Sequence, residues 1–91
     1  MSAIENQTIS KAREDLAERL DVSESAIITA GVEPTDFPDA SLGAPVEDEM
    51  SAQVITPGWQ IHLQTGSETY EYRATERQLR LVNFKGRNYR V

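Results

Sequence analysis

The chain has 91 residues, of which 38% are hydrophobic, and a net charge of −6, a composition typical of one small soluble domain. It contains no cysteine, so disulfides, thiolate catalysis and cysteine-ligated metal centres are excluded. A domain of this size buries roughly 60–65% of its unfolded surface. That is enough for one core and leaves little room for an enclosed catalytic cavity.

Charge is distributed unevenly along the chain. Residues 1–72 carry fourteen acidic and three basic side chains, whereas residues 73–91 carry six basic side chains and one acidic. The acidic majority disfavours general nucleic-acid binding, because most of the surface would repel phosphate. The N-terminus has no signal-peptide pattern and no apolar run is long enough to span a membrane, so we expect a cytoplasmic domain that does not contact membranes.

The first segment predicts a helix over residues 4–20. Four apolar residues recur at helical spacing and form one narrow stripe: Ile9, Ala12, Leu16 and Leu20. A stripe this narrow does not stabilise a free helix, so the helix is expected to pack on another apolar surface. Ser23 is expected to cap a short helical turn after it.

A strand and a long loop are predicted next. In "AIITAGVEP", Ile28, Ala30 and Val32 alternate onto one face, and Pro34 ends the strand or marks it as an edge strand. The loop from Thr35 to Glu49 contains "FPDASLGAPVEDE", which shows no usable hydrophobic period.

The second half of the chain predicts an antiparallel meander. Residues 50–64 indicate a strand, a break at Pro57–Gly58 and a second strand, because apolar and polar residues alternate on both sides of the break. Gly66 supplies the hairpin turn before the strand "ETYEYRA", and "LRLVNF" is expected to be the last strand. Residues 85–91 are expected to form a flexible basic tail.

Together these elements predict one α+β domain over residues 1–91, with an ordered core at about 4–84. Its N-terminal helix packs on a three- to four-stranded antiparallel meander. The helix stripe is expected to face the apolar side of the sheet: Trp59, Ile61, Leu63, Tyr70 or Tyr72, and Leu81.

Four sequence stretches carry a family resemblance: "DLAERLDVS", "FPDASLGAP", "QVITPGWQIHL" and "YEYRAT". Over about residues 10–84 the chain resembles a small bacterial domain family of uncharacterised function. The helix-and-meander order also resembles PepSY-type and cystatin-like two-layer domains, by analogy of fold alone. In relatives, a cysteine at the position of Ala44 can pair with one near the last strand, around Asn83. The resemblance therefore implies that this chain suits a reducing compartment and holds its loop by packing.

The loop is the candidate site. Phe37 and Leu42 would be presented as apolar anchors on a backbone stiffened by Pro38 and Pro45, with an acidic rim. The alternative is that both side chains fill the edge of the sheet, because long loops are often but not always functional. The predicted partner-binding residues are Phe37, Pro38, Asp39, Leu42, Gly43, Pro45 and Trp59.

We therefore expect a non-catalytic protein–protein interaction or inhibitor-like regulatory module, monomeric or weakly dimeric, that binds an unknown protein partner through residues 37–49. The alternative function is ion or small-ligand binding by the acidic residues of the loop, although their spacing does not match an EF-hand. No cofactor and no metal site is expected.

Two further patterns in the sequence could carry chemistry. His62 is the single histidine, and its alternation with Ile61 and Leu63 points it away from the core, without a nucleophile in reach that would indicate catalysis. Aromatic and arginine side chains could form a stacking surface for single-stranded nucleic acid, but the aromatic residues are better explained as core. These residues are Trp59, Tyr70, Tyr72, Arg73 and Arg80.

Overall fold

The structure, a computed structural model, describes residues 3–91. These residues form α1 (Ala3–Leu20), the short 3-10 helix η1 (Glu24–Ala26), β1 (Ile28–Phe37), β2 (Thr56–Thr65), β3 (Glu68–Ala74), β4 (Leu79–Phe84) and β5 (Arg87–Arg90).

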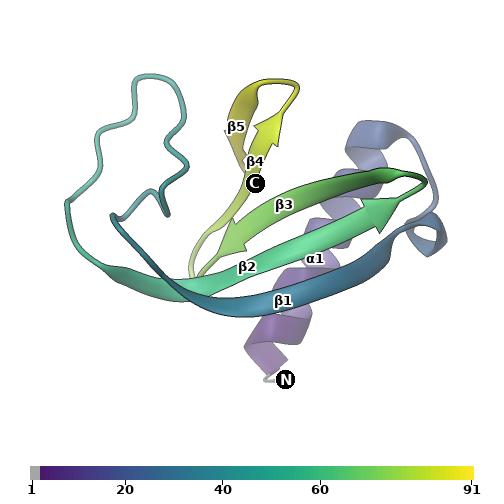
Figure 1. Cartoon of the computed structure of the whole chain (residues 1–91), viewed down its shortest axis with the longest axis horizontal. Helices are drawn as coiled ribbons and strands as arrows, with labels where there is room; N and C mark the ends of the chain where they lie inside the picture. The colour runs from purple at the N-terminus through teal and green to yellow at the C-terminus, as the bar shows by residue number, and fades with distance from the viewer. Residues whose placement is uncertain (1–2) are drawn as a thin grey trace.

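The strands form one antiparallel sheet in the order β1-β2-β3-β4-β5, and α1 lies across one face of it (Figure 1). The expected α+β architecture is therefore confirmed. The sheet has five strands rather than three or four, because the segment expected to be a flexible tail contains β5. Leu81 of β4 pairs with Tyr89, and Phe84 pairs with Arg87. Tyr89 also packs against the main core, which a loose tail would not do.

The helix forms as the apolar stripe predicts. Ile9, Ala12, Leu16 and Ala17 are buried, and Leu20 is half-buried. The helix ends where Asp21 adopts a positive φ of 54° and Val22 donates its N–H to the carbonyl of Ala17 at 3.0 Å. Ser23 then caps η1, as expected, by accepting a hydrogen bond from the N–H of Ser25.

The main core lies between α1 and the sheet. Its buried members are Ile9, Ala12, Leu16, Ala17, Ile27, Ile61, Leu63, Tyr72, Ala74, Leu79, Leu81 and Phe84. Trp59, Tyr70, Val32, Leu20 and Tyr89 pack at its margin.

A series of polar contacts beside this core connects α1 to β3 and β5. Tyr72 donates its hydroxyl hydrogen to Asp15 at 2.7 Å, and Asp15 pairs with Arg19 at 2.7 Å. The Arg19 guanidinium lies 4.5 Å from the ring centre of Tyr89. Burial, together with the Asp15 acceptor, raises the pKa of Tyr72 above its ordinary value of 10.0, so the phenol stays protonated and keeps donating.

The burial pattern of β1 differs from the sequence expectation. Ile28 is 63% exposed and Ala30 is exposed, because the pairing with β2 shifts register between Thr29 and Gly31. The residues expected to share one face therefore do not all face the core. Pro34 lies inside β1, which is an edge strand of the sheet, so the alternative that this proline marks an edge strand is confirmed.

The predicted strand at residues 50–55 is absent, and Pro57–Gly58 does not interrupt a strand. β2 begins at Thr56 and runs through both residues, which pair with Asp36 and Thr35 of β1. Residues 38–55 are consequently one long connection, named here the β1–β2 loop. Figure 1 shows it rising from the ends of β1 and β2 beside the β4–β5 hairpin.

No helix within residues 3–91 has both the length and the apolar character needed to cross a membrane.

Candidate functional site

The β1–β2 loop covers part of the sheet face opposite α1. Phe37 and Leu42 are 2% and 0% exposed, and Ala44 is also buried. Arg73, which alternates with the core residue Tyr72 and so points to this second face, donates from Nη1 to the carbonyl of Leu42 at 2.9 Å. Its guanidinium lies 5.8 Å from the ring centre of Phe37. The loop thus builds a second, smaller packed layer.

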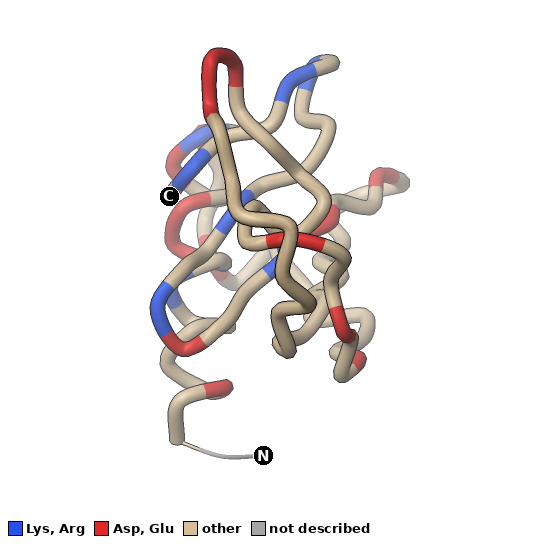
Figure 2. Tube along the Cα trace, turned by 90° about the vertical axis from the view of Figure 1, so that its left-hand side faces the viewer, with Lys and Arg blue, Asp and Glu red and all other residues tan. Residues whose placement is uncertain are grey.

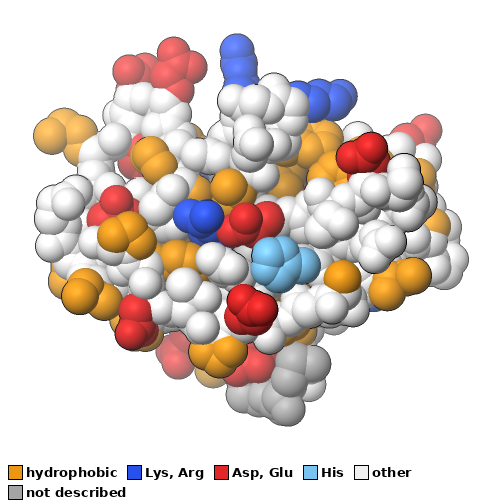
Figure 3. Space-filling model, viewed as in Figure 1, with side chains coloured by type: hydrophobic (Ala, Val, Ile, Leu, Met, Phe, Trp, Pro, Cys, Tyr) orange, Lys and Arg blue, Asp and Glu red, His pale blue; other side chains and the backbone are white. Residues whose placement is uncertain are grey.

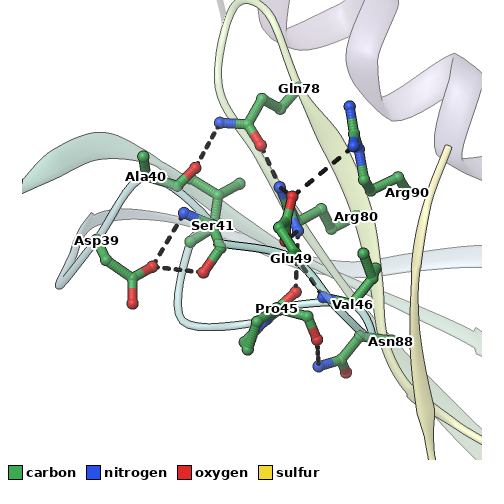
Figure 4. A network of polar contacts seen from close by, with 12 residues as sticks. Asp39, Ala40, Ser41, Pro45, Val46, Glu49, Gln78, Arg80, Asn88 and Arg90 are labelled. Carbon is green, nitrogen blue, oxygen red and sulfur yellow. Dashed lines mark hydrogen bonds and ion pairs between the residues drawn. The ribbon is translucent and has the colours of Figure 1, made fainter. Parts of the chain in front are cut away.

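A buried ion pair holds the far side of the loop (Figure 4). Arg80 of β4 is 4% exposed and makes a two-pronged contact with Glu49, with nitrogen–oxygen distances of 2.5 and 2.7 Å. Arg80 also donates to the Gln78 side chain and to the carbonyl of Ala44. The guanidinium of Arg80 is planar and carries five N–H donors, a geometry that matches these oxygen acceptors.

The hydrogen bonds from Arg80 lower the pKa of Glu49 from 4.5 to about 2, and this effect exceeds the opposing effect of burial. Arg90 of β5 lies 3.8 Å from the same carboxylate and adds a weaker contribution. At neutral pH Glu49 is therefore ionised and holds the loop against β4.

Asp39 shapes the first turn of the loop. Its Oδ1 accepts hydrogen bonds from the Ser41 hydroxyl at 2.6 Å, the Ser41 N–H at 3.0 Å and the Gly43 N–H at 3.1 Å. These bonds, of which the one from the Ser41 hydroxyl has the largest effect, lower the pKa of Asp39. Leu42 and Gly43 then turn through positive φ values of 61° and 66°.

Two side-chain amides tie the loop to the C-terminal strands (Figure 4). Gln78 donates to the carbonyl of Ala40 at 2.8 Å, and Asn88 donates to the carbonyl of Pro45 at 2.9 Å. The Asn88 side-chain oxygen accepts the N–H of Asn83, which lies at a register shift of the β4–β5 ladder. The loop is therefore attached to the sheet at several points between residues 39 and 49.

The structure separates the predicted site residues. Phe37 and Leu42 are buried, so neither side chain is on the surface as an anchor. Pro38, Gly43 and Pro45 are exposed and Asp39 is half-buried. Trp59 packs at the margin of the main core, on the helix side of the sheet, and its buried indole N–H has no hydrogen-bond partner within residues 3–91.

Sequence reasoning missed the residues that are apolar and exposed on this loop. Met50 is 97% exposed, Ile55 71% and Val54 53%. Residues 50–55 are named here the outer segment. The alternation of Met50, Ala52 and Val54 predicts a strand, but the segment has no strand to pair with, because β1 ends at Phe37 opposite Thr56. Figure 3 shows hydrophobic side chains spread over the surface of the loop, with acidic side chains among them.

Other candidate groups are placed apart. His62 is half-buried on the face opposite α1, across from Glu71 in the β2–β3 pairing, as its alternation predicted. Tyr72 is in the core, while Arg73 and Arg80 point to the other face, so these aromatic and arginine residues do not form one stacking surface. In the described part of the chain, no group of three or more His, Asp or Glu side chains is positioned to hold a metal ion.

A family model described as "Domain of unknown function (DUF8738)" matches residues 9–82, which is most of the chain. The chain belongs to this family. No curated protein and no solved structure matches it. The matched region contains most of α1, all of β1–β3 with the β1–β2 loop, and most of β4, so the loop and the arginines that hold it lie within the shared domain.

Proposed function

We propose that this domain is a non-catalytic, cytoplasmic protein-binding module whose contact surface is the outer segment, residues 50–55, of the β1–β2 loop. The observation that carries the proposal is the exposure of Met50, Val54 and Ile55 within six residues of a loop that is otherwise firmly held. Exposed apolar side chains gathered in one short segment favour an interaction site more than single exposed residues scattered over a surface do.

The outer segment is restrained at both ends and in the middle. Glu49 fixes its start through Arg80, the N–H of Ala40 donates to the carbonyl of Ala52 at 3.0 Å, and the Thr56 hydroxyl donates to the carbonyl of Val54 at 2.9 Å. A surface that is ordered before binding loses less conformational entropy when a partner docks. This arrangement supports a preformed docking loop, although its anchors differ from Phe37 and Leu42.

The partner is expected to present an apolar patch with basic groups at its rim. Glu47 and Asp48, both exposed, lie within three residues of the start of the outer segment, and the chain as a whole carries a net charge of −6. Complementary charge at a rim mainly raises the association rate and makes it sensitive to salt.

Ion binding by the acidic residues of the loop has less support. Oδ1 of Asp39 is occupied by three internal hydrogen bonds, and the carboxylate of Glu49 is occupied by Arg80. A cation would have to displace these donors to use either group.

The test is site-specific photo-crosslinking in the native cell, with a photoreactive residue at the exposed position Gln53. We expect a discrete crosslinked protein with the wild type and its loss in the Met50→Ser/Val54→Ser/Ile55→Ser variant, with thermal unfolding unchanged. The partner identified by mass spectrometry is then titrated with the purified domain.

The matched control is Val22→Ser/Ile28→Ser, which removes exposed apolar side chains at the other end of the sheet. This control should leave crosslinking intact. Equal crosslinking by the triple-serine variant contradicts the proposal. Crosslinks only to second copies of the chain would make the segment a dimer interface instead.

A further inference from the structure

A second surface lies on the other side of the same loop. The β1–β2 loop and the β4–β5 hairpin project from the same side of the sheet (Figure 1). Residues of both segments line an open cavity of about 480 Å³. This cavity is named here the notch, and its lining comes from Pro45, Val46 and Glu47 on the loop and from residues 86–90 on the hairpin.

The two walls of the notch carry opposite charge. Among the lining residues, Glu47 lies on the loop wall, and Arg87 and Arg90 lie on the hairpin wall. Asp48 and Lys85 are next to Glu47 and Gly86 in the sequence and extend the two charged walls, and Glu47, Asp48, Lys85 and Arg87 are all exposed. Figure 2 shows the acidic bend and the basic hairpin end projecting together at the top of the molecule. Within residues 3–91, no ion pair of 4.0 Å or less joins these four side chains to one another or to any other residue. The Lys85 ammonium lies 5.4 Å from the centre of the Phe84 ring, a contact that does not neutralise its charge. Both walls therefore keep their charge available to a ligand.

The two walls of the notch are joined to each other by hydrogen bonds and are fixed in position. Asn88 bridges them by donating to the carbonyl of Pro45 while accepting the N–H of Asn83. On the loop side, the turn from Val46 to Glu49 is closed by the hydrogen bond from the Glu49 N–H to the Val46 carbonyl, and Glu49 is anchored by Arg80. A gap with fixed walls of opposite sign favours a ligand that carries both charges, because each charge finds its complement without rearrangement of the walls.

We infer that the notch binds an extended peptide segment of a partner protein that carries an acidic and a basic side chain close together in its sequence. The basic side chain lies toward Glu47 and Asp48, and the acidic one lies toward Lys85 and Arg87. Pro45, Val46 and Tyr89 supply apolar lining for the stem of the peptide. A polyanion would be repelled by one wall and a polycation by the other. The inference deepens the proposed protein-binding function and rests on it for the class of partner.

The test is selection from a random peptide library displayed on phage, with the intact domain as bait. We expect enriched peptides that carry both an acidic and a basic residue, and chemical-shift changes on binding at the amides of Val46 and Asn88. Reversing one wall, by Glu47→Lys/Asp48→Lys or by Lys85→Glu/Arg87→Glu, should weaken a selected peptide about tenfold or more. Fresh selection on the two variants should yield purely acidic and purely basic peptides, respectively.

The control variants make the same changes in net charge at positions outside the notch. Glu14→Lys/Glu18→Lys on α1 and Lys11→Glu/Arg77→Glu change net charge equally at exposed positions outside the notch, and should change peptide affinity less than threefold. A matching thermal transition for each variant excludes unfolding as the cause of lost binding. The Met50→Ser/Val54→Ser/Ile55→Ser variant should bind the selected peptide like the wild type, which separates this test from that of the outer segment.

Failure to enrich peptides, or peptides whose binding ignores the four wall charges, would overturn the inference. Displacement of the peptide by an equal concentration of free glycine would also overturn it, because the notch would then be a site for small zwitterions. If the wild-type domain gives no crosslink from Gln53 but still binds the selected peptide, that result would count against the proposed function alone.

Discussion

The pair formed by Glu49 and Arg80 governs how the candidate loop is held. A charge as buried as that of Arg80 is costly unless its donors are satisfied, and here the Glu49 carboxylate, Gln78 and the Ala44 carbonyl satisfy them. Glu49 and Arg80 lie 31 positions apart in the sequence, so the pair attaches the loop to a distant strand rather than closing a local turn. Nothing in the spacing of acidic residues distinguishes Glu49 from its neighbours Glu47 and Asp48, which is why sequence reasoning grouped all three as an acidic rim.

We predict that Glu49→Gln destabilises the domain by about 2–3 kcal/mol at neutral pH. The expected cost of breaking a buried pair is about 3–5 kcal/mol, and it is reduced here because Arg80 keeps two other acceptors. Chemical denaturation measures the loss, and Glu47→Gln, an exposed residue, is the matched control with a change below about 0.5 kcal/mol.

The Glu49–Arg80 pair determines the direction in which the stability of the domain changes with pH. Because the folded pKa of Glu49 is lowered from 4.5 to about 2, its contribution to stability is fully present above about pH 4.5 and is lost as the pH falls toward 2. The stability gap between wild type and Glu49→Gln should therefore be constant from neutral pH to about 4.5 and shrink below it. A gap that does not change with pH would show that the carboxylate charge is not what holds the loop.

At the scale of elements, β2 contains the Pro57–Gly58 pair, although a proline followed by a glycine usually indicates a turn. Pro57 is tolerated because β3 pairs with β2 only from Trp59 onward, so this part of β2 has a neighbour on one side alone. Gly58 is required because a Cβ there would lie 2.1 Å from the Ala74 carbonyl oxygen and 3.0 Å from the Phe37 ring. The Pro-Gly pair therefore marks a close approach of β3 and of the base of the loop, not a bend.

We predict that Gly58→Ala costs at least about 2 kcal/mol, because the added methyl group meets backbone that cannot move aside. It should also increase amide exchange in the β1–β2 loop, since Phe37 packs at the same point. The matched control is Gly31→Ala in β1, where a Cβ has no neighbour within 4 Å and the expected change in unfolding free energy is about zero or slightly stabilising. Equal thermal midpoints for the two variants would contradict this explanation of the Pro-Gly pair.

At the scale of the whole molecule, features that depend on residues close together in the sequence could be predicted, whereas features that depend on contacts between distant residues could not. The apolar stripe of α1, the Ser23 cap and the positive φ of Gly66 depend on residues a few positions apart, and all are present. The burial of Leu42 depends on Arg73 reaching across the second face of the sheet, which no periodicity reveals.

The alternation of Met50, Ala52 and Val54 was real but did not indicate a strand. A strand needs a partner, and β1 has already ended its pairing at Phe37 opposite Thr56. The strand β5 was not predicted for a similar reason, because its formation also depends on partners elsewhere in the chain. Arg87, Asn88 and Arg90 give it a polar composition, and its packing depends on contacts that Tyr89 makes with α1 and β4, which the sequence does not show.

These contacts predict that removal of residues 87–91 lowers the stability of the whole domain. The truncation deletes the β4–β5 hydrogen bonds, the edge-to-face packing of Tyr89 on Phe84 at 6.0 Å and the stacking of Arg19 on Tyr89. A loss of about 2–3 kcal/mol is expected, which in a domain of this size lowers the thermal midpoint by roughly 10–20 °C.

The control for this truncation is the full-length Arg87→Gln/Arg90→Gln variant, which removes the same two positive charges and leaves Tyr89 in place. Because exposed charges contribute little, its thermal midpoint should fall by much less than that of the truncated chain. An unchanged midpoint in the truncated chain would instead mean that the sheet is complete with four strands and that the chain after Gly86 is a tail. If the midpoint falls as expected, β5 is part of the single cooperative unit that also carries the notch and fixes the β1–β2 loop.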